Sequence, residues 1–183
     1  MNSKVKEKFQ SLEYQKEYLL TLSGDVTEAE ANKKFNADQW SLAQTLYHIY
    51  LVEQKTFDDI SKRIKYNQDA EPVGLKEKFR HSLLKLFLRL PLKFKAPKTV
   101  SESIPDQINL NELRSDWSNL RESFRLLLSI QTDQQLDLKL FKHPSVGYLN
   151  LIQTIEFIKA HHKHHLPQIK RLLSNIKTQT TVV

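Results

Sequence analysis

The sequence predicts an all-α fold, a four-helix bundle formed by a single domain over residues 1–183. Four segments, each roughly 20 residues long, carry the 3.6-residue periodicity of amphipathic helices. Strand signals are scarce, because no alternating apolar run is bounded by hairpin residues. The chain has only 3 Gly and 6 Pro, few turn residues for a sandwich or barrel and few for a glycine-rich phosphate loop.

The first predicted helix covers residues 3–22, and Gly24 provides a stop signal just beyond it. Lys16 interrupts its apolar face. The second, over residues 42–65, begins with a capping-box pattern in which Ser41 and Gln44 satisfy backbone N–H groups reciprocally. Its main apolar stripe consists of Leu42, Leu46, Ile49, Tyr50, Phe57, Ile60 and Ile64.

The third predicted helix covers residues 110–130, with Asn109 as its N-cap. The fourth covers residues 151–173 and contains Pro167, a residue that kinks helices. Residues 175–183 are polar and are predicted to fray as a tail.

A connection of about 44 residues joins the second helix to the third. Loops of that length without structure are uncommon, so residues 74–90 are predicted to form a helix of their own. Extended chain around residues 94–105 should then lead into the third helix. The connection is therefore expected to be partly helical.

The net charge of +7 is concentrated in a basic insertion at residues 72–98, which has eight Lys and Arg against one acid, Glu77. The rest of the chain then has 28 − 8 = 20 basic and 21 − 1 = 20 acidic residues, and is neutral. The insertion favours a helix that packs on the bundle and turns its Lys and Arg side chains to solvent. Two alternatives assign the insertion a function. In one, its positive charge attracts an anionic substrate. In the other, residues 76–98 form a basic surface-binding module for a membrane surface. Nucleic acid is disfavoured, because no aromatic stacking platform accompanies the charge.

The composition excludes other classes. There is no Cys, which rules out disulfides, thiolate metal sites and a cysteine nucleophile. The N-terminal residues 1–16 are mostly polar, and no apolar run approaches the roughly 18 residues of a membrane span. A cytoplasmic location is therefore expected.

Four histidines fall within residues 161–165, on the fourth predicted helix. His161 and His165 stand at i and i+4 in its apolar stripe, where two imidazoles can bind one cation. His162 with His165, at i and i+3, is a rival pair. A helical histidine pair can equally belong to a solvated face, so periodicity leaves both interpretations open. No Glu stands beside the pair as in H-E-x-x-H, which disfavours a metalloprotease.

Two histidines are too few to hold a metal ion, so a third ligand is required. His81 lies in the basic insertion and His143 in a loop before Pro144. His48 lies on the second helix, nearly opposite its main stripe and on a weaker apolar strip. By periodicity alone, His48 is interpreted as a surface histidine.

Several segments resemble the DinB-like (DinB/YfiT) superfamily of metal-dependent enzymes. They are WSLAQ at residues 40–44 with His48 and Glu53 after it, HPSVGYLN at 143–150, AHHKHHLPQI at 160–169 with the family's H-x-x-x-H-x-x-Q-I signature, and KAP at 95–97. The resemblance covers residues 40–173 and implies an up-down-down-up four-helix bundle, often dimeric.

The resemblance also implies a metal triad of His48, His161 and His165. It therefore makes His48 a metal ligand, although helical periodicity places this residue outside the main apolar stripe. His162 and His164 become flanking residues, and Gln44 and Gln168 are candidates for polar groups in the pocket. The implied function is hydrolysis or S-transfer on a small molecule, with a divalent transition metal and, for S-transfer, a low-molecular-weight thiol. Zinc or nickel is expected, with iron as the next alternative, because imidazole suits all three. The competing hypothesis is a non-catalytic helical stress-response or binding protein.

Overall fold

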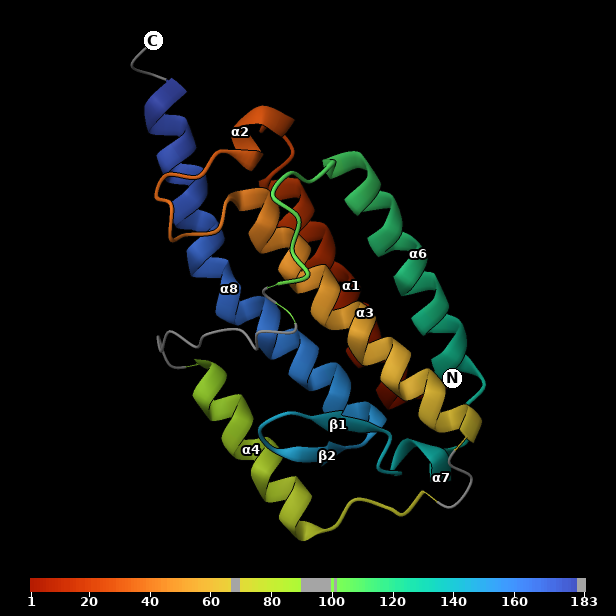
Figure 1. Ribbon diagram of the computed structural model, residues 1–183. Coiled ribbons are helices and arrows are strands. Elements are labelled where there is room, and N and C mark those ends of the chain that lie inside the picture. The colour runs from red at the N-terminus through yellow and green to blue at the C-terminus, as the bar shows by residue number, and fades with distance from the viewer. Residues whose placement is uncertain (67–69, 90–99, 101, 181–183) are drawn as a thin grey trace.

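The computed structural model describes residues 1–66, 70–89, 100 and 102–180. Its elements are α1 (Ser3–Leu22), α2 (Glu28–Asn32), α3 (Leu42–Tyr66), α4 (Leu75–Arg89), α6 (Leu110–Ser129), α7 (Asp133–Leu136), β1 (Phe141–His143), β2 (Gly147–Leu149) and α8 (Leu151–Thr180). The four long helices α1, α3, α6 and α8 form the predicted bundle (Figure 1).

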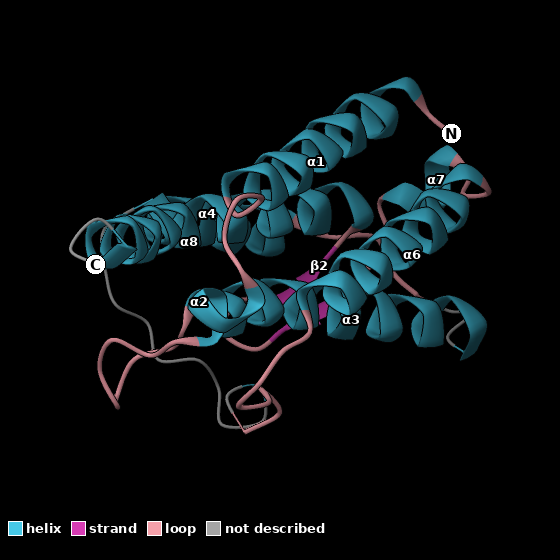
Figure 2. Cartoon of the chain, turned by 90° about the horizontal axis from the view of Figure 1, so that it is seen from above, coloured by secondary structure: helices cyan, strands magenta, loops and turns pink. Residues whose placement is uncertain are grey.

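The bundle has the up-down-down-up order. In Figure 1, α1 and α8 run in one direction and α3 and α6 in the other. Contacts join α1 to α8, α8 to α3, α3 to α6 and α6 to α1, so α1 and α3 are diagonal. These two helices overlap in Figure 1 and lie on opposite sides of the molecule in Figure 2. Because α3 and α6 are parallel, the chain must return along the bundle between them, which explains the long connection.

Capping residues set where α3 and α6 begin. Ser41 and Gln44 form the predicted capping box, with reciprocal backbone bonds of 3.1 and 3.2 Å. Asn109 caps α6 by accepting from two backbone N–H groups. The predicted helix within the connection is confirmed as α4, whereas most of the extended stretch predicted at 94–105 lies outside the described residues.

Three features differ from expectation. The predicted frayed tail is wrong for residues 175–180, because α8 continues through Pro167 to Thr180 and buries Ile176 in the core. The hairpin of β1 and β2 was not predicted, because strands of three residues show no alternation. Gly147, at φ +83°, occupies the left-handed region that glycine tolerates at the start of β2. The short helices α2 and α7 were also missed, although each has a capping box, Thr27–Glu30 and Thr132–Gln135.

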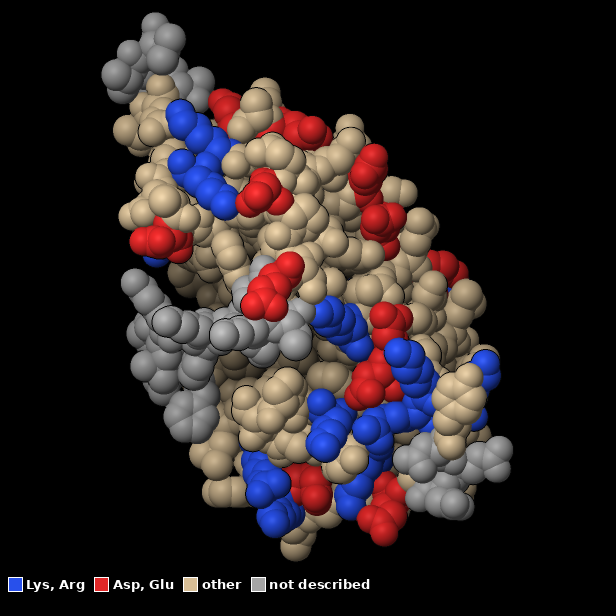
Figure 3. All heavy atoms as spheres, viewed as in Figure 1, with Lys and Arg blue, Asp and Glu red and all other residues tan. Residues whose placement is uncertain are grey.

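The basic insertion packs on the bundle through α4. His81 and Leu84 are buried, and Lys85 donates to Glu156 on α8 over 2.9 Å. Lys and Arg side chains gather on the lower half of the face in Figure 3, over the hairpin and the second half of α3. In the described part of the chain, no helix is long and apolar enough to cross a bilayer.

A buried polar network ties all four bundle helices together. The Arg121 guanidinium on α6 donates to Glu53 on α3 over 2.7 Å and to Glu13 on α1 over 3.1 Å. His162 on α8 hydrogen-bonds to the same Glu53 carboxylate. Burial alone would raise the pKa of Glu53, but Arg121 and then His162 hold it below its usual value.

Candidate metal centre

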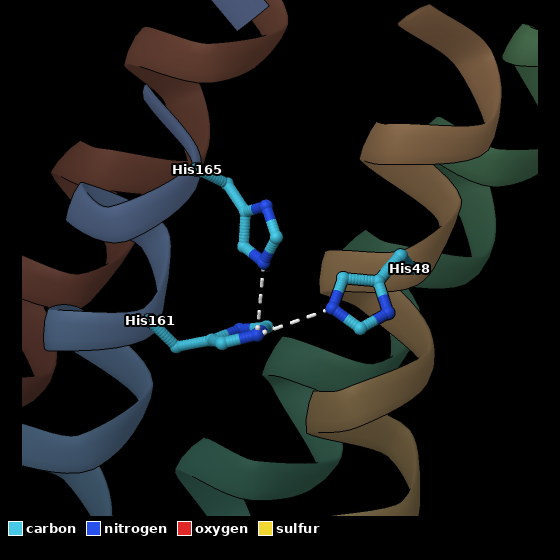
Figure 4. Close-up of side chains that lie close together, drawn as sticks. All are labelled: His48, His161 and His165. Atoms are coloured by element: carbon cyan, nitrogen blue, oxygen red, sulfur yellow. Dashed lines mark hydrogen bonds between the residues drawn. The ribbon is translucent and has the colours of Figure 1, made fainter. Parts of the chain in front are cut away.

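Three histidines from two helices converge in the interior. His48 is on α3, and His161 and His165 are one turn apart on α8. Figure 4 shows their rings pointing toward one another. The Nε2 atom of His161 lies 3.2 Å from that of His48 and 3.2 Å from that of His165. The candidate ligand atoms all lie within 4.8 Å of one another.

These distances suit a shared metal ion better than mutual hydrogen bonds. The Nε2 atom of a neutral imidazole has one proton or one lone pair, so that of His161 cannot serve both neighbours well. Nitrogen ligands placed tetrahedrally at roughly 2.0–2.1 Å from zinc lie about 3.3 Å from each other. The donor set and its spacing therefore fit a divalent transition metal.

Burial keeps the three imidazoles neutral. Burial, with smaller contributions from His165 and His164, lowers the pKa of His48 to about 3. Burial also lowers the pKa of His165 to about 4 and that of His161 well below its usual value of 6.5. At neutral pH each ring thus has a lone pair available, as a metal ligand must.

A hydrogen-bonded chain orients His165. Its Nδ1 atom lies 3.0 Å from Oε1 of Gln168, whose Nε2 donates to the Thr45 hydroxyl over 3.1 Å. The Thr45 hydroxyl donates in turn to the Ser41 carbonyl at the start of α3. Such a partner on the second nitrogen fixes the tautomer that presents Nε2. The Nδ1 atoms of His48 and His161 have no partner among the described residues.

The interpretation of His48 as a surface residue from periodicity is wrong, since its exposed fraction is 4%. The reason is that α3 buries two faces, and the weaker strip that contains His48 faces α8. The Trp40 ring also covers it, with centroids 4.8 Å apart. Only the family resemblance pointed to this histidine.

The rival pair is not formed. The His162 ring bonds to Glu53 and packs against Trp117, with centroids 5.7 Å apart. This buried Glu53–His162 contact was missed at the sequence level, where Glu53 stood only as part of the quoted motif. One signal was available: His162 lies toward the apolar stripe of its helix, where an imidazole requires a partner.

The two glutamines differ in role. Gln168 supports His165 directly. Gln44 is buried, its side chain occupied by the capping box and by the Pro105 carbonyl, to which its Nε2 donates over 3.0 Å. It is not among the described residues that line the cavity beside the triad. Its position on the first turn of α3 explains this, because its amide oxygen accepts from the Ser41 backbone and its amide nitrogen donates to the loop at Pro105.

The three histidines open onto one cavity. It has a volume of about 940 Å³ and is bounded by α3, α4, α8 and the hairpin. Trp40 and His164 also line it near the triad. A ligand in this cavity therefore reaches the histidines directly.

The fold and the site together define a four-helix-bundle protein with a buried three-histidine cluster at the end of a ligand-sized cavity. The family model of the DinB superfamily matches residues 11–169, and the chain belongs to that superfamily. The chain is 24% identical over 152 residues to the uncharacterized protein YuaE of Bacillus subtilis (strain 168), covering 83% of this chain and 88% of YuaE.

Two solved structures share the fold. YfiT from Bacillus subtilis, described as a probable metal-dependent hydrolase with an unusual four-helix bundle topology, superposes with a TM-score of 0.61 at 16% identity, over 97% of this chain and 90% of YfiT. An uncharacterized protein from Clostridium difficile 630 superposes with a TM-score of 0.53 at 11% identity, over 100% of this chain and 99% of that one. At these identities the likeness concerns the fold alone.

Proposed function

We propose that the protein is a metal-dependent hydrolase that acts on a small molecule, with His48, His161 and His165 as the metal ligands. The observation that carries this proposal is the convergence of three neutral imidazoles within ligand distance at the wall of a cavity. The description of YfiT as a probable metal-dependent hydrolase supports the same class of activity.

Three protein ligands leave coordination positions open, as in catalytic sites and unlike closed structural sites. When bound, a divalent ion supplies Lewis acidity, which polarises a substrate carbonyl and acidifies water at the site. Gln168 and Thr45 hold the His165 ring in place, and Trp40 covers His48. The residues of the chain thus provide a buried ligand set in which hydrogen bonds hold the His165 ring. Zinc or nickel suits three imidazoles best, with iron next.

Transfer of a low-molecular-weight thiol is the second chemistry that this site supports. The cavity volume of about 940 Å³ is near the upper end of the roughly 300–1,000 Å³ typical of ligand pockets. It therefore offers room for a substrate together with a small thiol. A panel of ester and amide substrates, assayed with and without added thiols, separates hydrolysis from S-transfer.

Elemental analysis of protein purified without a histidine tag tests the metal site. We expect about one zinc or nickel ion per chain, lost in H48A, H161A and H165A while the helical circular dichroism remains. H164A is the matched control, because it removes a neighbouring histidine outside the triad and should keep the metal. A wild-type protein that takes up neither metal on titration would contradict the proposal.

The other functional alternatives stay predictions. A non-catalytic helical protein would bind no metal in the same analysis. A basic surface-binding module would bind anionic vesicles with steep salt dependence, weakened by neutralising residues of the 76–98 segment. A homodimer is tested by sedimentation of the purified chain.

A further inference from the structure

The cavity extends well beyond the histidine triad, along one face of α3. His48, Val52, Thr56, Asp59 and Arg63 all line it, at intervals of four, four, three and four residues. At about 1.5 Å rise per residue, His48 and Arg63 stand roughly 22 Å apart along the helix axis. The cavity is therefore elongated, with the triad at one end and Arg63 toward the other.

The end far from the triad is positively charged. Arg63 from α3, Arg80 from α4 and Lys142 from β1 line it. Asp59 is the single acidic residue among the described residues that line the cavity. Its carboxylate already accepts from the Lys142 backbone N–H over 3.2 Å and pairs with Arg63 at 3.5 Å. One carboxylate against several cations leaves an excess of positive charge that favours an anionic ligand.

Arg63 is held ready for such a ligand. Its guanidinium stacks over the Tyr148 ring, with Cζ 4.9 Å from the ring centroid, and its side chain is only 23% exposed. Its buried Nε atom lies 3.5 Å from Oδ2 of Asp59 and makes no hydrogen bond among the described residues. A planar, fixed guanidinium suits carboxylate or phosphate oxygens, which it binds in pairs.

The wall between the two ends is mainly apolar, although Lys55 and Thr56 also line it. Leu84 and Leu88 follow Arg80 by one and two turns on α4, and Phe157 precedes His161 by one turn on α8. Val52 follows His48 by one turn on α3. Each of the three helices therefore places an apolar side chain between the cationic end and the triad.

We propose that the substrate is an elongated anion with an apolar body. Its carboxylate or phosphate binds at Arg63, Arg80 and Lys142, its apolar body lies along Val52, Leu84 and Phe157, and its opposite end reaches the histidines. The inference rests on the proposed function for the role of the triad, but the binding of the anion itself requires no metal.

Calorimetric titration of the full chain with decanoate, decyl phosphate and decanol tests the proposal, on protein with and without metal. We expect both anions to bind at least 10-fold more tightly than decanol, in either metal state. The comparison of decanoate with decyl phosphate identifies the preferred anionic group, and hexanoate should bind more weakly than decanoate because it covers less of the apolar wall.

Two variants localise the anion. R63M removes the guanidinium but keeps an unbranched side chain, and should weaken decanoate binding about 10-fold without affecting decanol. R80M neutralises an exposed cation at the same end of the cavity and should act in the same direction. K65M is the matched control, because it neutralises an exposed cation of α3 that does not line the cavity.

Equal binding of decanoate and decanol would overturn the proposal, as would unchanged decanoate affinity in both R63M and R80M. Loss of the anion preference with normal metal content refutes this inference alone. Normal anion binding in a protein without metal affinity refutes the proposed function alone.

Discussion

The Nε2 atoms of His48 and His161 lie 3.2 Å apart, although 113 residues separate the two histidines in the chain. The pairing depends on α3 and α8 being neighbours in the bundle, with His165 added one turn further along α8. The measurable properties of the site therefore follow from the packing between these two helices, and from the groups that hold each ring in place.

Replacing Gln168 should weaken metal binding without unfolding the protein. Gln168 fixes the tautomer of His165, and loss of such a partner typically lowers metal affinity about 10–100-fold. We expect this loss in Q168A, measured by competition with a chromophoric chelator. Q168E retains an acceptor for the His165 Nδ1–H and should preserve the affinity. Equal affinities of Q168A and wild type would show that the contact has no orienting role.

The buried ion pair between Arg121 and Glu53 should make a large contribution to stability in single-variant tests. R121M leaves the Glu53 carboxylate buried without its cation, a change that costs about 3–5 kcal/mol in comparable buried pairs. Urea denaturation followed by circular dichroism measures this. R125M, which breaks an exposed pair with Glu122 on the same helix, should leave the free energy of unfolding almost unchanged.

The double variant E53Q/R121M checks the physical reason. It removes the uncompensated carboxylate as well as the guanidinium, so it should recover part of the stability that R121M loses. If the double variant is less stable than R121M, the cost arises from lost packing rather than from an unpaired charge.

Metal-free protein should lose stability as the pH falls from about 6.5 toward 4. The pKa of His48 is about 3 and that of His165 about 4 in the folded protein, whereas unfolding restores values near 6.5. Above pH 6.5 both states are neutral at these rings and the histidines give no pH dependence. Below it the unfolded state binds more protons, so the free energy of unfolding decreases, and the loss levels off below the folded-state pKa.

Chemical denaturation of chelator-treated protein at a series of pH values between 7.5 and 4.5 measures this dependence. H48Q removes one of the contributing groups and should have a shallower slope than wild type. Parallel slopes for the two proteins would contradict the assignment of lowered pKa to His48.

Replacing Gly147 should strain the hairpin that walls the cavity. A Cβ added there would lie 3.6 Å from the Arg80 Nη1 atom, an ordinary contact, so space is not the problem. The φ of +83° is the problem, because an L-residue in that region costs about 1–2 kcal/mol. G147A should be destabilised by this amount in thermal unfolding, whereas S145A, in the turn just before β2, should not. Equal melting temperatures would mean that the hairpin adjusts without cost.

Local interactions made much of the fold predictable. The starts of α3 and α6 follow from the Ser41–Gln44 box and the Asn109 cap, and helical periodicity indicated four long helices with their apolar faces. The length of the connection was enough to predict α4. The hairpin was not predicted, because its three-residue strands are too short to show an alternating pattern. They depend instead on the packing of the paired residues Phe141 and Leu149.

The candidate metal site was likewise predictable in part from the sequence and in part only from the structure. The i, i+4 spacing of His161 and His165 is a property of one helix, so the sequence alone could present them as a metal-binding pair. His48 could not be placed by periodicity, because a helical wheel ranks the faces of a helix by polarity and does not say which neighbour covers each face. Tertiary packing decided that the weaker strip of α3 faces α8, that His162 turns to Glu53, and that Arg63, Arg80 and Lys142 meet at one end of a cavity. Each of these contacts joins segments distant in the chain, and only the packed bundle brings them within reach of one another.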